Sequence, residues 1–216
     1  MRTSVLTTLL LLVGVTALPL CAGTIPIMYG TGVDASGNDL AGGSADPHYT
    51  ISPPGSAAIV ESASSHYPAW VAGQWDSSND STSNACCGDY VFTTQLDLVG
   101  YSSYSGTLVS LQWSADDSAS DILINGIDQP GTALGNGSWS SLYTFTIDGS
   151  NSALQWNAIN TVTFTVDFTD VETNGLIVDV TSAAPSLDGS TPEPSTLFLL
   201  AGGLGCIALF ARLKLA

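Results

Sequence analysis

Acidic side chains gather in two short segments whose composition suits a hard cation. Residues 34–39 place oxygen-bearing side chains at alternate positions, with a glycine for the turn, at Asp34, Ser36 and Asn38. The second segment supplies three carboxylates, Asp116, Asp117 and Asp121. Calcium prefers oxygen ligands in flexible loops, so calcium is the cofactor we expect if there is one, although the first segment lacks the downstream glutamate of a complete calcium loop. The alternative is a solvated acidic surface that keeps the protein in solution.

The sequence contains no motif of a known catalytic class. Gly-x-Ser-x-Gly, His-Glu-x-x-His and a phosphate-binding loop are all absent. His48 and His66 stand among so many Ser and Asp residues that a nearby partner carries no information, and we interpret both as structural or surface residues. Paired carboxylates can hydrolyse glycosides, but only at a defined separation that sequence proximity does not supply. We therefore predict a non-catalytic protein, with a glycan-active enzyme as the alternative.

Several tryptophans stand beside Gly, Ser, Asn or Pro, where loops are expected. Trp113 is different, because it alternates with Val109 and Leu111 and is predicted to lie in the core. Aromatic rings on loops stack on sugar rings, and neighbouring amides bind hydroxyl groups. The predicted ligand-binding residues are Trp70, Trp75, Trp139 and Asn125. The alternative is that these rings fill small satellite cores.

Positive charge is almost absent from the chain. Lys and Arg total 3 against 19 Asp and Glu, which gives a formal net charge of −16. The positive residues stand at the two ends (Arg2, Arg212 and Lys214), so residues 24–190 contain no Lys or Arg. Nucleic-acid binding needs such residues and is excluded, and their scarcity argues against phosphate clamping and against docking on an anionic membrane surface.

The middle of the chain has the two-residue period of half-buried strands. In residues 160–168 the apolar positions are Val162, Phe164, Val166 and Phe168. The same alternation appears in residues 90–98, 109–113, 143–147 and 176–180, and a short apolar run at 122–124 ends in an Asn-Gly turn. Many short strands separated by polar turns predict an all-β, antiparallel β-sandwich or jelly roll. Apolar residues form 44% of the chain, enough for a folded core.

The N-terminus has the order of a secretory signal peptide. Arg2 is followed by an apolar run over residues 5–18 and by a small-x-small cleavage site at residues 21–23. We expect residues 1–23 to form a signal helix that signal peptidase removes. A lipoprotein interpretation of Cys21 is weaker, because Leu20 occupies the position where a small residue is wanted.

Export bears on the adjacent cysteines Cys86 and Cys87. Cys21 and Cys206 lie in terminal segments that we expect to be removed. An exported chain meets oxidising conditions, so a disulfide between Cys86 and Cys87 is predicted, with the strain that adjacent Cα positions impose. Intermolecular pairing and free thiols are the alternatives.

The C-terminus combines a short motif, an apolar stretch and a basic end. Pro192, Glu193 and Pro194 precede an uncharged stretch over residues 197–211, and Arg212 and Lys214 follow. Fifteen helical residues span only about 22 Å against a hydrocarbon core of about 30 Å, so a permanent tail anchor would be short. The order resembles the PEP-CTERM sorting signal of exported bacterial proteins. That resemblance implies recognition by exosortase, a membrane intermediate held by a C-terminal transmembrane helix, and delivery to the cell surface or extracellular matrix.

The middle carries a second resemblance. Residues 113–117 followed by 121–126, the strand entry at 158–164 and the segment at 174–176 are similar to stretches of galactose-binding-like jelly rolls. Residues 30–34, 46–49 and 67–70 are similar to stretches of other PEP-CTERM proteins. The resemblance implies a non-catalytic jelly-roll domain and makes extracellular polysaccharide a possible partner.

The expected organisation has four parts. A signal peptide occupies residues 1–23, a β-sandwich domain 24–181, a linker 182–191 and the sorting segment 192–216. The expected function is that of an exported surface or matrix protein with weak polysaccharide binding. The remaining alternative is a purely structural surface protein that associates with itself.

Overall fold

The structure is a computed structural model of the 216-residue chain, and it describes residues 27–62, 71–78, 87–169 and 174–184. The chain separates into two compact units, one formed by Ile25–Leu187 and the other by Met1–Thr24 with Asp188–Ala216. All of the described residues belong to the first unit. The predicted signal peptide and the sorting motif at residues 192–194 lie outside the described residues, as do the helices expected at both ends.

The described part of the first unit is all β, apart from one turn of 3-10 helix, η1 (Ser138–Ser140). This confirms the predicted fold class. The strands are β1 (Ala45–Ser52), β2 (Ser56–Val60), β3 (Trp75–Ser77), β4 (Gly88–Asp97), β5 (Thr107–Asp116), β6 (Ser118–Ala119), β7 (Leu123–Ile124), β8 (Ile127–Asp128), β9 (Tyr143–Asp148), β10 (Ile159–Phe168) and β11 (Gly175–Ala183). Within these residues, no helix has the length and hydrophobicity needed to cross a membrane.

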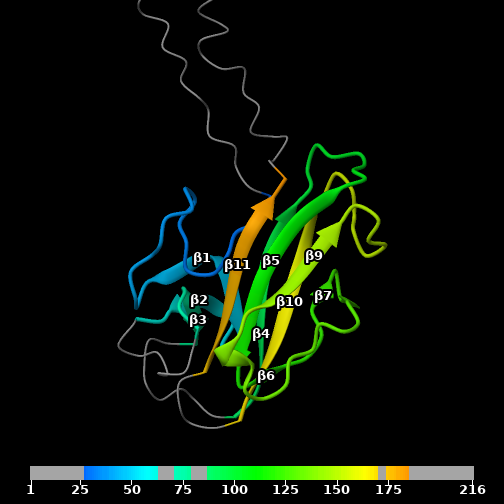
Figure 1. Cartoon of the computed structure of the whole chain (residues 1–216). Coiled ribbons are helices and arrows are strands. Elements are labelled where there is room, and N and C mark those ends of the chain that lie inside the picture. Colours follow the sequence, from blue (N-terminus) through cyan, green and yellow to red (C-terminus); the bar gives the residue numbers. More distant parts are fainter. Residues whose placement is uncertain (1–26, 63–70, 79–86, 170–173, 185–216) are drawn as a thin grey trace, which may run out of the picture. The chain divides into compact units, whose positions relative to one another are not determined.

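The strands form one antiparallel sheet that curls on itself (Figure 1). Its order is β8-β7-β10-β4-β1-β2-β3-β11-β5-β9, with β6 paired to β10 outside this path. The two longest pairings are β10 with β4 and β11 with β5. The curl brings these two pairs face to face, and their inward side chains form the core between them, as in a sandwich.

The core consists of the residues that the alternating pattern selects. On β10, Val162, Phe164, Val166 and Phe168 are all fully buried. The opposite layer contributes Trp113 from β5, whose ring centroid lies 5.3 Å from that of Phe164. The prediction that Trp113 is a core residue is therefore confirmed. Burying such large side chains is the main driving force for closing the sheet, because apolar area is removed from water.

One strand buries less than its pattern predicts. The alternation placed Tyr143, Phe145 and Ile147 of β9 on one face, yet Tyr143 is 43% exposed and only Ile147 is fully buried. The reason is position, because β9 is the last strand in the sheet order and pairs on one side only, with β5. A sequence pattern reports which residues share a face, but not whether another layer covers that face.

The turn between β7 and β8 and the end of β11 can be compared with the predicted boundaries. The predicted Asn-Gly turn joins β7 to β8, with φ of 52° at Asn125 and 77° at Gly126, the positive values that a tight two-residue hairpin requires. At the other end, β11 continues to Ala183, inside the segment expected to be linker. The ladder with β5 still includes Ser182 and Ala183.

Asn160 anchors the loop before β10. Its side chain is fully buried, and its Oδ1 accepts hydrogen bonds from the Gln155 N–H and from Nδ2 of Asn125, both at 2.7 Å. Its Nδ2 donates to the carbonyl oxygens of Gln155 (2.9 Å) and Ala158 (3.2 Å). One amide therefore connects the start of β10, the loop before it and the β7–β8 turn.

Replacing Asn160 with alanine should destabilise the protein. The Asn160→Ala change removes the acceptor of the part-buried Gln155 N–H and one acceptor of the Asn125 amide, which should lower the free energy of unfolding by about 1–3 kcal/mol. Urea denaturation measures the loss. The control is Asn136→Ala, at an exposed loop position, where we expect almost no change. Equal effects of the two substitutions would contradict the anchoring role.

Candidate functional site

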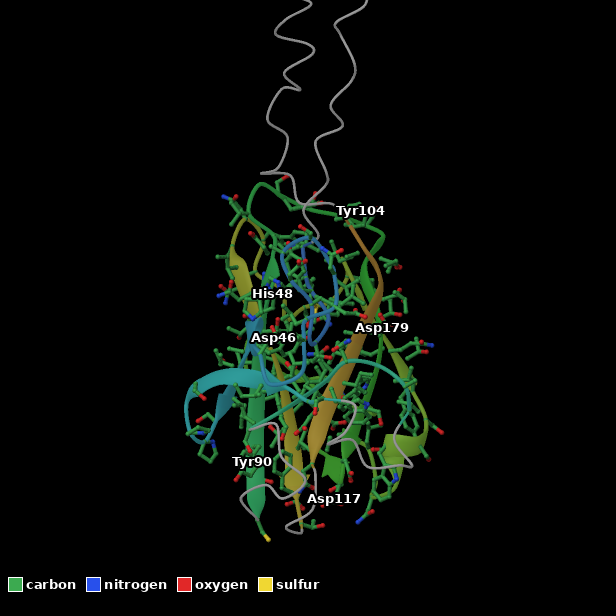
Figure 2. All side chains as sticks on the ribbon, turned by 90° about the vertical axis from the view of Figure 1, so that its left-hand side faces the viewer. Asp46, His48, Tyr90, Tyr104, Asp117 and Asp179 are labelled. Carbon is green, nitrogen blue, oxygen red and sulfur yellow. The ribbon has the colours of Figure 1, made fainter. Side chains whose placement is uncertain are left out.

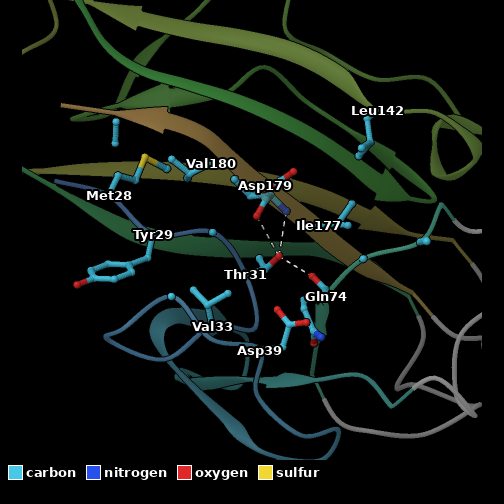
Figure 3. A pocket seen from close by; sticks show the side chains of 16 residues that line it. Met28, Tyr29, Thr31, Val33, Asp39, Gln74, Leu142, Ile177, Asp179 and Val180 are labelled. Atoms are coloured by element: carbon cyan, nitrogen blue, oxygen red, sulfur yellow. Dashed lines mark hydrogen bonds between the residues drawn. The ribbon is translucent and has the colours of Figure 1, made fainter. Parts of the chain in front are cut away.

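A pocket of about 580 Å³ opens beside β11, where the neighbour of this strand changes. β3 pairs with β11 only through Leu176 and Ile177. Beyond that point the N-terminal segment, residues 28–33, lies beside β11 instead. The pocket forms at this junction, and its volume falls in the range of roughly 300–1,000 Å³ that small-molecule sites occupy. Figure 3 shows the lining side chains.

The N-terminal wall is fastened to β11 by Thr31. The backbone N–H of Thr31 donates to the Val178 carbonyl oxygen at 2.9 Å, and its Oγ1 accepts from the Val178 N–H at 3.0 Å. The same hydroxyl donates to the carbonyl oxygen of Gln74 at 2.6 Å, which ties in the segment before β3 (Figure 3). The approach is close enough to require glycine next to Thr31, because a Cβ at Gly30 would lie 2.6 Å from the Val178 oxygen.

A buried carboxylate also holds the N-terminal wall of the pocket in place. Asp46 of β1 accepts hydrogen bonds from the backbone N–H groups of Gly32 (2.6 Å), His48 (2.6 Å) and Tyr49 (3.2 Å). The first bond reaches the N-terminal segment, and the other two close the start of β1. The hydroxyl of Tyr49 donates to the Tyr29 carbonyl oxygen at 3.1 Å, and the Tyr29 ring stacks on His48 with centroids 3.8 Å apart. His48 is therefore a structural residue, as the sequence indicated.

Asp76 of β3 lies beside Asp46, away from solvent. Burial raises the pKa of Asp76 well above its usual value, and the charge of Asp46 and a hydrogen bond to Asp46 raise that pKa further, as does the charge of Glu61. Asp76 is therefore protonated more readily than a carboxyl group in water. Burial likewise raises the pKa of Tyr49, with the charges of Asp76 and Asp46 adding to the shift, so its phenol remains a neutral donor.

The pocket itself offers polar groups on an apolar background. Asp39, Asp179, Gln74 and Tyr29 come from four different segments and surround the opening, as Figure 3 shows. The apolar part of the lining comes from Met28, Val33, Leu142 and Ile177. The Tyr29 hydroxyl donates to the Ala35 carbonyl oxygen at 3.2 Å, so this ring is held in place from both ends. A mixed lining of this kind suits an uncharged or cationic polar ligand with some C–H surface.

The prediction of a ligand-binding ring is wrong for Trp75, and Trp139 does not line the pocket. Trp75 is fully buried, and its Nε1 donates to the Val71 carbonyl oxygen at 3.0 Å. It forms a small second core with Ile177, and Trp139 packs half-buried against this pair. Since the core lies beneath residues 71–74, the two rings support one side of the pocket rather than line it. The third ring, Trp70, lies outside the described residues.

Asn125 also has a structural role instead of the predicted binding role. Its Nδ2 donates to the Ala153 carbonyl oxygen (2.8 Å) as well as to Asn160, and its Oδ1 accepts from the Thr161 N–H (3.0 Å). These bonds hold the β7–β8 turn against β10. Both N–H groups of the side-chain amide are therefore used within the fold.

The first predicted calcium segment, residues 34–39, forms hydrogen bonds within itself. Oδ1 of Asp34 accepts hydrogen bonds from the backbone N–H groups of Asn38 (2.9 Å) and Ser36 (2.8 Å), and the Asn38 amide also donates to this carboxylate. The bonds from Asn38 and Ser36 lower the pKa of Asp34. The residues predicted as cation ligands are thus partners of each other in an Asx-type turn.

The prediction of one cation site from Asp116, Asp117 and Asp121 is wrong. Asp117 accepts from the N–H and hydroxyl of Thr169, whereas Asp121 accepts from the N–H groups of Thr132 (2.9 Å) and Ala133 (2.7 Å). Asp116 is buried at the end of β5, opposite Gly175. Figure 2 places Asp117 at the end of the sheet opposite Tyr104 and away from Asp46. In the described ranges, no group of three or more His, Cys, Asp or Glu side chains could hold a metal ion.

Cys87 is disulfide-bonded, and its Sγ lies 3.5 Å from the Thr169 carbonyl oxygen. Its predicted partner, Cys86, lies outside the described residues. An oxidised cysteine agrees with the oxidising surroundings expected of an exported chain.

Sequence reasoning did not single out the residues that line the pocket. Asp179 had a usable signal, because it lies on the face of its strand opposite Leu176, Val178 and Val180, where the alternation predicts exposure. Asp39 ends the segment 34–39 that was assigned to a cation, and Tyr29 and Gln74 stand in segments without a period.

Comparison with known proteins yields little. No protein-family model matches the chain, and no curated protein matches it. A solved structure, the native structure of a family 35 carbohydrate binding module from Clostridium thermocellum, is similar at 14% sequence identity. The TM-score is 0.37, and the match covers 73% of this chain and 98% of that chain. A likeness of this size carries neither a ligand nor an activity over to this protein.

The buried acid pair predicts an unusual pH dependence of stability. Because the pKa of Asp76 is raised in the folded state, its protonation favours folding, and stability falls as pH rises from about 4 towards that raised pKa, by up to about 1.4 kcal/mol per pH unit. Asp76→Asn keeps a donor for Asp46 but does not titrate. Its Tm should exceed that of the unmodified protein at pH 8 and converge with it near pH 4.

Thermal melts between pH 4 and pH 9 measure this difference. The control is Asp128→Asn, at an exposed position on β8, which should leave the slope of Tm against pH unchanged. Parallel curves for Asp76→Asn and the unmodified protein would show that Asp76 does not titrate in the way described.

Proposed function

We propose that this chain is an exported, non-catalytic binding protein whose pocket beside β11 takes a segment of an extracellular polysaccharide. The pocket carries the proposal, because it combines an amide, two carboxylates and a phenol with apolar side chains. Sugars present hydroxyl groups at their edges and C–H groups on their faces, and such a lining can bind both. The absence of Lys and Arg from residues 24–190 disfavours phosphorylated or other anionic ligands.

The exported location is part of the proposal and rests on the sequence of the two ends. A signal peptide over residues 1–23 and the PEP-CTERM arrangement from residue 192 would deliver the β-domain to the cell surface or matrix through signal peptidase and exosortase. Cys87 in a disulfide supports an oxidising destination.

A non-catalytic role is favoured over glycoside hydrolysis by the exposure of the pocket acids. Asp39 and Asp179 both lie open to solvent. A hydrolase needs one carboxyl group held in an apolar environment so that it stays protonated as the general acid. Asp76, the buried acid whose pKa is raised, does not line the pocket.

Blocking the pocket should abolish binding. Ala72 lines the pocket and is exposed, so Ala72→Trp should fill the opening without disturbing the core. In calorimetric titration of the full chain against bacterial and plant polysaccharides, we expect this variant to bind any recognised polymer about tenfold more weakly or worse. Ala133→Trp, at an exposed position outside the pocket, should bind as the unmodified protein does.

Two outcomes would contradict the proposal. Failure of the unmodified chain to bind any polymer would remove the binding function, and equal binding by both tryptophan variants would place recognition elsewhere. Release of new reducing ends from a bound polymer would favour the enzyme alternative.

A further inference from the structure

We infer that the pocket beside β11 selects polysaccharide segments that carry free amino groups, as in a partly de-N-acetylated amino-sugar polymer. The inference rests on the proposed function and names the ligand class of the same site. It depends on two carboxylates, Asp39 and Asp179, that line the pocket from opposite strips of chain. Asp39 belongs to the loop after the N-terminal segment, and Asp179 points outward from β11.

Unlike most of the other acids, the two pocket carboxylates accept no hydrogen bond from the described part of the chain. Asp34, Asp46, Asp117, Asp121 and Asp148 each accept hydrogen bonds from neighbouring N–H or hydroxyl groups. Among the described residues, no donor is bonded to the side chain of Asp39 or Asp179. Their oxygen lone pairs therefore remain available to a ligand, and both lie at an opening large enough to admit one.

The charge around these two acids has no compensation within the domain. The pocket lining contains no Lys, Arg or His, and residues 24–190 contain no Lys or Arg at all. A cavity lined by one sign of charge concentrates ligands of the opposite sign and repels those of its own. An ammonium group placed near either carboxylate gains a charge-assisted hydrogen bond, whereas a uronic acid would bring a third negative charge.

The rest of the lining distinguishes an amino sugar from a simple amine. The partly exposed Val33 and Leu142 supply an apolar surface that a pyranose ring can cover, and the Gln74 amide can bind its hydroxyl groups. Tyr29 is held by its stack on His48 and by its hydroxyl bond to the Ala35 carbonyl oxygen, so this part of the wall is formed before a ligand arrives. A prearranged wall reduces the entropy cost of binding.

Three oligosaccharides of equal length separate this inference from the proposed function. The full chain is titrated with a β-1,4-glucosamine pentamer, its fully N-acetylated form and a β-1,4-glucose pentamer, at a pH where the free amines are protonated. We expect the glucosamine pentamer to bind about tenfold or more tightly than the other two. We also expect this preference to shrink at high salt, because exposed charges are screened.

Charge-neutralising variants locate the preference. The double variant Asp39→Asn with Asp179→Asn keeps the size of both side chains and should bind all three pentamers alike. The control is Asp128→Asn, which removes one exposed charge outside the pocket and should keep the full preference. Circular dichroism and Tm confirm that each variant is folded before it is titrated.

Each result decides one of the two claims. Equal binding of the three pentamers by the unmodified chain would overturn the amine selectivity and leave the polysaccharide site standing. Amine preference that survives in the Asp39 and Asp179 double variant would assign it to the general acidity of the surface and overturn the inference as well. Binding of none of these pentamers or of any other polysaccharide would remove both claims.

Discussion

The carboxylate of Asp46 fixes the segment on which the pocket depends. It is buried in β1 and accepts backbone N–H groups from its own strand and from Gly32, which lies in the N-terminal segment. Thr31 fastens the same segment to β11, and the Tyr49 hydroxyl and the stack of Tyr29 on His48 hold it against β1. Such a carboxylate can be buried because three backbone N–H groups donate hydrogen bonds to it.

Acidity serves two different purposes in this domain, and burial separates them. Inside the sheet, Asp46 accepts three backbone hydrogen bonds, and burial beside Asp46 raises the pKa of Asp76. At the surface, several aspartates cap turns, as Asp34 and Asp121 do by accepting N–H groups of their own loops. Asp39 and Asp179 line the pocket without such bonds, and the proposed ligand contacts centre on them.

The sheet could be predicted from the sequence, because a two-residue period has one physical cause. Phe164 and Trp113 lie in the core because alternate side chains of a strand point to the same face. The loop residues could not be predicted in the same way. Trp75 stands between Gln74 and Asp76 in a polar stretch, yet it is fully buried against Ile177, a contact that joins positions a hundred residues apart.

The sequence by itself determined the class of fold and the excess of negative charge, and it predicts the two terminal signals, since these depend on composition and on short-range order along the chain. Tertiary structure alone decided which acids are buried, which cap turns and which face an opening. Asp76 and Asp179 have similar sequence contexts, because each follows an apolar residue in a strand. They differ because the curl of the sheet places Asp76 beside Asp46 in the interior and leaves Asp179 facing solvent, and electrostatic free energy depends on that difference in surroundings.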